Sequence, residues 1–263
     1  MIYGLFSVLL AIVPAVLLIF FIVGKDKKQP EPPGQLVKAF FYGVLSLFVA
    51  YAFSKVIELF IYVGDATVGD MINRAFWEAA IPEEMSKLLM LWLLLRKNKY
   101  FDEHFDGIVY AVMIGLGFAT VENLLYMADN YDRWAWVGTV RALLSVPGHY
   151  VFAVLMGYYY SLAQFSPRKR VFYWIMALFV PILLHGLYDA LLMVVEVVPM
   201  FLGLLSIVLC IVLCYYMHKE AFRRINKHLQ ADSIIVPEVS ETSRTPSQDD
   251  IEYVDYEETK QDE

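Results

Sequence analysis

The chain has 263 residues, of which 59% are hydrophobic and 19% charged, and its mean hydropathy is +0.53. This composition excludes an ordinary soluble globular domain and indicates an integral membrane protein. The formal charge of −7 arises in residues 231–263, which hold eleven Asp and Glu against two Lys and Arg. The remainder is close to neutral, so we expect the lipid bilayer, and no nucleic acid, as a partner.

Seven apolar segments approach or exceed the roughly 20 residues that a helix needs to cross a bilayer. They are residues 2–23, 36–63, 75–95, 107–127, 141–165, 171–195 and 199–217. The connections are short, so we expect one all-α, polytopic bundle of about seven transmembrane helices. The predicted organisation is a transmembrane domain over 1–218, a basic juxtamembrane segment over 219–230 and an acidic, disordered tail over 231–263.

Basic residues are concentrated on alternate connections. The first, third and fifth connections and the C-terminal flank together hold fourteen Lys and Arg residues, whereas the other connections hold only Arg74, Arg133 and Arg141. Because cytoplasmic loops retain positive charge, we expect the N-terminus outside and the C-terminus in the cytoplasm. The first apolar segment has lysines behind it and no basic region ahead of it, as expected of a membrane span rather than a cleaved signal peptide.

Ionisable residues interrupt four of the predicted spans. They are Glu83, Glu84 and Lys87 in the third, Glu122 in the fourth, His149 in the fifth, and His185 and Asp189 in the sixth. Five of them lie in one layer in the predicted orientation, about 8 to 15 Å below the outer surface at the rise of an α-helix: Glu83, Glu122, His149, His185 and Asp189. Buried charges in a membrane are costly and usually mark a functional site. A single histidine within a membrane is more often structural, but the seven ionisable residues together predict a functional site.

The spacing within each span supports this interpretation. Lys87 follows Glu83 by four residues and Glu84 by three, so it can neutralise a carboxylate on its own helix face. Asp189 follows His185 by four residues and can orient its imidazole. His149 begins a stripe that continues with Ala153 and Gly157, where small residues would let another helix approach closely.

These residue types suit two kinds of chemistry. Carboxylates and imidazoles can activate water, protonate a leaving amine and stabilise an oxyanion, as amide hydrolysis requires. They can also bind a divalent metal and leave one carboxylate as general base. A non-enzymatic alternative is a transporter or receptor with a polar intramembrane cavity. A transporter would more often show internal duplication and broken helices in both halves, and neither is visible here.

Four motifs, in order over about residues 80 to 190, resemble those of the PrsW family of intramembrane proteases. They are Glu83-Glu84-x-x-Lys87, Phe118-x-x-x-Glu122, His149-x-x-x-Ala153-x-x-x-Gly157 and His185-x-x-x-Asp189. The distantly related superfamily of CAAX prenyl proteases and bacteriocin-immunity proteins has similar motifs, namely Glu-Glu-x-x-x-Arg, Phe-x-x-x-His and His-x-x-x-Asn. The chain departs from all three of these, which favours PrsW, with a CAAX-type prenyl-protein protease as the alternative.

The resemblance implies an endopeptidase of the bacterial plasma membrane that makes the first cut in an anti-sigma factor or a similar single-pass protein. The implied cofactor is a divalent metal, with zinc as the first candidate and with His149, His185 and Glu122 as candidate ligands. Related CAAX enzymes are discussed as glutamate-dependent, so His149 and His185 could instead be proton and oxyanion partners. Resemblance and spacing together assign Glu83 or Glu84, and Glu122, to water activation. Asp189 orients His185, and Lys87 keeps a carboxylate ionised.

The charge distribution predicts which connections are accessible from outside. In a variant without Cys210 and Cys214, a single cysteine near Asp129 should react with a membrane-impermeant thiol reagent in intact cells, and one near Lys97 should not. The second cysteine should react after the cells are permeabilised. The opposite pattern would reverse the predicted orientation.

Overall fold

The computed structural model describes residues 2–27 and 29–235, which form nine α-helices and no strand. The helices are α1 (Ile2–Val23), α2 (Pro33–Glu58), α3 (Val68–Asn73), α4 (Ile81–Leu95), α5 (His104–Asp129), α6 (Trp134–Val140), α7 (Val146–Phe165), α8 (Arg170–Met193) and α9 (Met200–Ile235). Two π-helical turns, η1 (Arg74–Ala80) and η3 (Arg141–Ser145), lead directly into α4 and α7. Three short 3-10 turns complete the order: η2 (Tyr131–Arg133), η4 (Pro167–Lys169) and η5 (Val194–Glu196).

Five helical stretches in the described part of the chain are long and apolar enough to cross a membrane. They are Pro33–Glu58, His104–Asp129, Tyr131–Phe165, Pro167–Glu196 and Met200–Ser233. The predicted all-helical, multi-pass membrane bundle is therefore confirmed.

The other two predicted spans are shorter or interrupted. The predicted third span divides into η1 and the 15-residue α4, because Pro82 lies in the first turn of α4 and cannot donate a backbone hydrogen bond. The first predicted span coincides with α1, a 22-residue apolar helix that contains Pro14. Seven spans and the orientation remain predictions.

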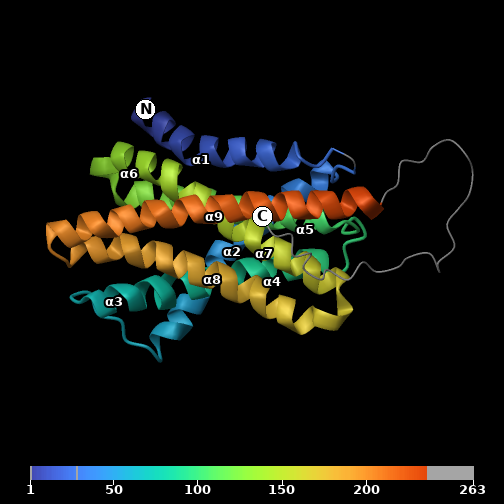
Figure 1. The fold of residues 1–263 in the computed structure, drawn as a ribbon. Coiled ribbons are helices and arrows are strands. Elements are labelled where there is room, and N and C mark those ends of the chain that lie inside the picture. The colour runs from blue at the N-terminus through green and yellow to red at the C-terminus, as the bar shows by residue number, and fades with distance from the viewer. Residues whose placement is uncertain (1, 28, 236–263) are drawn as a thin grey trace, which may run out of the picture.

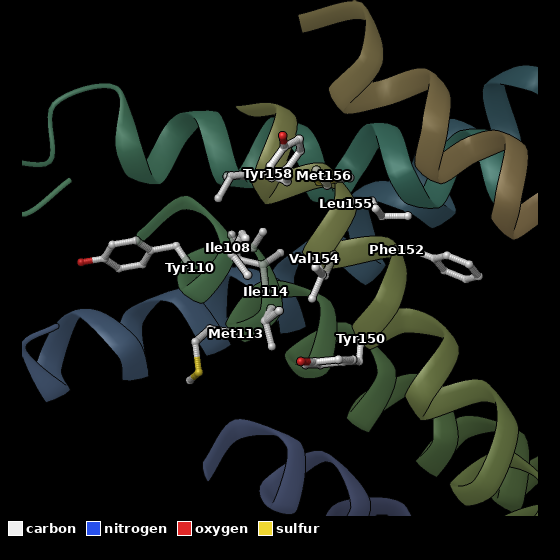
Figure 2. Packing of buried hydrophobic residues seen from close by; sticks show 14 of the residues in the cluster. Ile108, Tyr110, Met113, Ile114, Tyr150, Phe152, Val154, Leu155, Met156 and Tyr158 are labelled. Carbon is white, nitrogen blue, oxygen red and sulfur yellow. The ribbon is translucent and has the colours of Figure 1, made fainter. Parts of the chain in front are cut away.

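The helix α5 is the centre of the bundle. It packs most extensively against α7 and α2, and also contacts α1, α4 and α9. Apolar side chains from α5 and α7, among them Ile108, Ile114 and Val154, form the main core (Figure 2). The N-terminus, α3, α6 and the start of α9 lie at one end of the bundle, whereas the described part of α9 finishes at the other (Figure 1). Side chains on α5 and α7 are therefore well placed to meet in the interior.

Small residues allow α5 and α7 to approach closely. A Cβ atom added at Gly157 would lie 2.7 Å from the Cα atom of Ile108, and one added at Gly115 would lie 2.7 Å from the Cβ atom of Ala153. Both separations are far below van der Waals contact, so the two helix backbones meet where the sequence predicts a stripe of small residues. The close contact sets the register that brings His149 of α7 beside α5.

The far end of α9 is attached to the start of α5. The carboxylate of Asp232 accepts hydrogen bonds from the backbone N–H groups of His104 and Phe105, both at 2.9 Å. These N–H groups have no partner within their own helix, and an acidic group there is also favoured by the helix dipole. The helix α9 therefore continues to Ile235, and the predicted boundary of the tail at residue 231 falls inside it. The rest of the predicted tail, 236–263, lies outside the described residues.

The connection between α1 and α2 packs against the same end of α5. Glu31 accepts a hydrogen bond from the hydroxyl group of Tyr110, and Glu103 accepts one from Gln29 at 2.9 Å. Burial raises the pKa of Glu31 and the pKa of Glu103 to about 7. Because these carboxyls hold their protons more tightly when folded, they stabilise the protein at low pH, and this contribution is lost as the pH rises through 7.

The contact between α5 and α7 predicts how sensitive the bundle is to added volume. Gly157→Ala should lower the free energy of unfolding by about 1 to 3 kcal/mol, the usual cost of overpacking a tight interior. The measurement is a denaturant titration in detergent micelles. The matched control is Gly34→Ala, because a Cβ at that position would meet nothing within 4 Å beyond its chain neighbours and its own helix backbone. Equal stability of the two variants would show that the helices separate easily.

Candidate active site

Three of the predicted site residues lie in the first two turns of α4. The ammonium group of Lys87 lies 3.1 Å from Glu83 Oε2 and 2.8 Å from Glu84 Oε1. The side chain of Glu84 is fully buried and that of Lys87 is 3% exposed, whereas that of Glu83 retains 13% exposure. Because buried charges require partners, the lysine and the two carboxylates stabilise one another inside the bundle. Glu83 is the carboxylate of this pair that reaches accessible space.

Lys87 also links α4 to α5 and α7. Its Nζ atom lies 3.1 Å from His149 Nδ1 and 4.0 Å from the ring centroid of Phe118. An ammonium group can only donate, so Nδ1 of His149 must accept and the proton of a neutral imidazole must be on Nε2. That Nε2–H donates to Glu122 Oε2 at 2.9 Å. The geometry therefore assigns one tautomer to His149. Phe118 and Glu122, one turn apart on α5, contact Lys87 and His149 respectively.

His185 of α8 lies on the other side of the two α4 carboxylates. Its Nδ1 atom is 2.9 Å from Glu84 Oε1, and its Nε2 atom is 3.3 Å from Asp189 Oδ2. The ring stacks on Phe152 with centroids 4.7 Å apart. Asp189 thus contacts the imidazole from one turn away on the same helix, as the four-residue spacing predicts.

The structure brings together all seven residues that the sequence singles out. A cavity of about 220 Å³ is lined by Glu83, Glu122, His149, His185 and Asp189 among other residues. Glu84 and Lys87 are not among the lining residues, but each contacts Glu83, His149 or His185. The four helices α4, α5, α7 and α8 contribute to one polar site.

A larger hollow of about 370 Å³ is lined by other residues of α4, including Met85, Leu88 and Trp92, and by Trp174 and Leu178 of α8. None of its lining side chains is titratable. The chemistry therefore belongs to the smaller polar cavity, whatever the relative sizes of the two hollows.

Four side chains of the site could hold a metal ion. One ligand atom from each of Glu83, Glu84, His149 and His185 lies within 4.8 Å of the other three. The Oε2 atom of Glu84 is buried and has no hydrogen-bond partner, although a buried carboxylate oxygen normally has one. Two imidazoles and two carboxylates suit zinc and similar divalent ions. The donor set therefore fits a metal.

The charges of the site also suit a divalent ion. Among the described residues, the carboxylates of Glu83, Glu84, Glu122 and Asp189 face two permanent cations, Lys87 and Arg141. Two negative charges remain when His185 is neutral, and a divalent ion would balance them. Lys87 contacts three of the four donor residues, so its ammonium must turn aside for a metal to bind. Glu122, which the sequence offers as a ligand, lies outside the group of four.

The sequence did not identify Arg141 as part of the site. Charge counting treats it as one of three basic residues on outer connections, but its guanidinium lies 2.6 Å from Glu122 Oε2. Arg141 begins η3, and π-helical turns are frequent at functional sites. The only sequence signal was a basic residue at the end of an apolar segment, eight positions before His149.

Apolar membrane-crossing helices enclose a polar cavity with donors for a metal ion, an arrangement that suits a membrane-embedded metalloenzyme. Comparison with known proteins identifies the family. The model of the PrsW family of intramembrane metalloproteases matches residues 31–217, more than half of the chain. The chain belongs to the PrsW family of intramembrane metalloproteases.

Individual relatives agree with this assignment. The chain is 38% identical over 190 residues to Protease PrsW of Clostridioides difficile (strain 630), covering 71% of this chain and 79% of the relative. It is 34% identical over 206 residues to Protease PrsW of Geobacillus kaustophilus, covering 78% of this chain and 88% of the relative. For Protease PrsW of Bacillus subtilis (strain 168) the identity is 36% over 179 residues, covering 68% and 78%. No solved structure matches the chain.

The family assignment confirms the resemblance that the four motifs predict. It favours a protease over the transporter, receptor and CAAX-type alternatives, because the matched region includes all four motifs. The roles of the individual site residues remain predictions.

The cluster of four donors predicts which residues are needed for metal binding. The purified protein should retain about one zinc ion per chain after dialysis, and His149→Ala and His185→Ala should each lose it. His218→Ala is the matched control, because His218 of α9 bonds the carbonyl of Cys214 and lies outside the cluster. Glu122→Gln should weaken zinc binding without abolishing it, because Glu122 lies outside the four donors but bonds His149. The measurement is elemental analysis, and zinc retained by both site variants would exclude this donor set.

Proposed function

We propose that this protease makes the first cut in a single-pass membrane protein, such as an anti-sigma factor, near the outer end of its transmembrane helix. The observation that carries this proposal is the buried cluster of Glu83, Glu84, His149 and His185 beside a polar cavity. Residues from the last turns of α5, from η3 and from the end of α8 line the cavity. In the orientation predicted by the positive charges, all of these are outer ends.

The two carboxylates of α4 have different roles in this proposal. Glu83 lines the cavity and is partly exposed, so it is the better placed of the two to take a proton from the attacking water. Glu84 is fully buried and, with His149 and His185, would hold the metal. We propose zinc, which when bound would polarise the scissile carbonyl and lower the pKa of water. If the family chemistry were glutamate-dependent instead, Glu83 would keep the same role.

The histidines and their carboxylate partners complete the site. Asp189 fixes the ring of His185, and both side chains line the cavity that would receive the peptide. We propose that Glu83 itself delivers the proton that it takes from water to the leaving amine. Glu122 fixes the ring of His149 and, together with Glu83, keeps the cavity polar enough to admit water. The charge of Lys87 favours the ionised form of a carboxylate on α4.

The position of the cut follows from how a peptide can reach this layer. A helical substrate hides its amides in internal hydrogen bonds, and breaking these in the bilayer core leaves unsatisfied groups that each cost several kcal/mol. Unwinding costs least near a helix end, where water can satisfy the released groups. The expected products are therefore a released ectodomain and a membrane stub for another protease.

The proposal predicts where a substrate is cleaved and which variants fail. With a single-pass substrate in the same membrane, cleavage should occur just outside its helix or within the first turns of the outer end. Glu83→Gln should slow cleavage at least about 100-fold, the lower range for losing a general base. Glu58→Gln is the matched control, because Glu58 forms only an exposed pair with Lys55 at the end of α2.

Mass spectrometry of the released fragment gives the position of the cut. Cleavage in the cytoplasmic half of the substrate helix would contradict the predicted orientation or the assigned layer. Undiminished cleavage by a well-expressed Glu83→Gln variant would remove Glu83 from the chemistry.

A further inference from the structure

We propose that Arg141 is a positioning residue of the active site, which holds the Glu122 carboxylate so that it fixes the tautomer and orientation of His149. In this arrangement Nε2–H of His149 donates to Glu122, and Nδ1 is presented to the cluster of Glu83, Glu84 and His185. The inference rests on the proposed role of His149 as a metal ligand. It extends that function to a residue on a different structural element.

Three contacts on α5 hold the guanidinium of Arg141 in one place. One nitrogen donates to Glu122 Oε2 at 2.6 Å, and Nε donates to Asn123 Oδ1 at 2.7 Å. The guanidinium carbon lies 3.9 Å from the ring centroid of Tyr126. The Arg141 and Glu122 side chains are only 15% and 14% exposed, so this charge-assisted hydrogen bond is largely protected from water.

The same oxygen of Glu122 receives both Arg141 and His149. Because Oε2 lies 2.6 Å from Arg141 and 2.9 Å from His149 Nε2, moving the carboxylate would change both bonds. Nδ1 of His149 lies 3.1 Å from the ammonium of Lys87, which can only donate. The series of hydrogen bonds from Arg141 through Glu122 to His149 therefore leaves a lone pair on Nδ1 of His149 facing the donor cluster. A metal would need the same lone pair.

Arginine suits this position better than lysine. Its rigid fork reaches Glu122 and Asn123 at once while its face stacks on Tyr126, whereas a lysine could supply the charge but not this geometry. Carboxylates that orient a metal-binding histidine typically contribute 10- to 100-fold to metal affinity or activity. We expect Arg141, acting through Glu122, to contribute a similar factor to metal affinity. A purely structural role would be to anchor η3 to α5 and would leave His149 unchanged.

Zinc affinity tests the inference without any knowledge of the substrate. In the purified full-length protein, Arg141→Ala should weaken zinc binding by about 10- to 100-fold, and Arg141→Lys by less. Guanidinium at millimolar concentration should partly restore affinity in Arg141→Ala. Arg133→Ala should bind zinc as the wild type does, because the Arg133 side chain is 68% exposed on η2. The measurement is competition with a chromophoric chelator.

A double variant separates an effect through Glu122 from a general one. Glu122→Gln should also weaken zinc binding, and adding Arg141→Ala to it should cause no further loss. Additive losses, or zinc affinity in Arg141→Ala within twofold of wild type, would overturn the inference. A lower unfolding temperature with unchanged affinity would show that Arg141 is only an anchor for η3.

Nitrogen NMR of the histidine side chains supplies a readout that does not depend on metal. In the metal-free protein His149 should carry its proton on Nε2, and in Arg141→Ala this tautomer should mix with the other. His149→Gln assigns the signal. An unchanged tautomer in Arg141→Ala would overturn the inference. Failure of the wild type to bind zinc, with the tautomer shift present, would refute the proposed metal and leave the role of Arg141 intact.

Discussion

The polar interior depends on one buried cation, the ammonium of Lys87. It lies within 3.1 Å of Glu83, Glu84 and His149, which come from α4 and α7. Without it, two carboxylates would lie close together in a membrane interior, where an unpaired charge costs several kcal/mol. Lys87 therefore makes it possible to bury a fully desolvated Glu84. It also competes with a metal for the same donors, so metal binding and the position of this side chain are coupled.

The helix packing explains how these charges can meet. The backbones of α5 and α7 approach closely at Gly157 and Gly115, and this contact places His149 opposite the polar end of α5. On the other side, Gly186 packs against the ring of Phe76 in η1, directly beside His185. Glycine thus permits close approach next to both histidines. Close approach is what allows short side chains from different helices to share hydrogen bonds in a membrane.

Irregular helix geometry borders the site on two sides. The π-helical turns η1 and η3 precede α4 and α7, the helices that carry Glu83, Glu84 and His149. In each case a proline, Pro82 or Pro147, lies in the first turn of the α-helix that follows. A proline lacks an N–H group, so the preceding turn must be satisfied differently, and the wider turn does so. This geometry brings Arg141 within reach of Glu122.

The sequence by itself determined the membrane bundle and the seven residues of the polar site. A chain with several long apolar segments is expected to form membrane-spanning helices. Burying a charged residue within such a helix costs so much free energy that it usually indicates a functional role. Spacing also predicted the contact of Lys87 with the α4 carboxylates and of Asp189 with His185, because residues three or four apart share a helix face. Only the tertiary structure decided which residues meet across helices. It grouped Glu83 and Glu84 with the two histidines, placed Glu122 between His149 and Arg141, and brought Arg141 into the site. Contacts between helices depend on packing and register, which local periodicity does not encode, and for this reason a basic residue at the edge of a span could be assigned to the active site only in three dimensions.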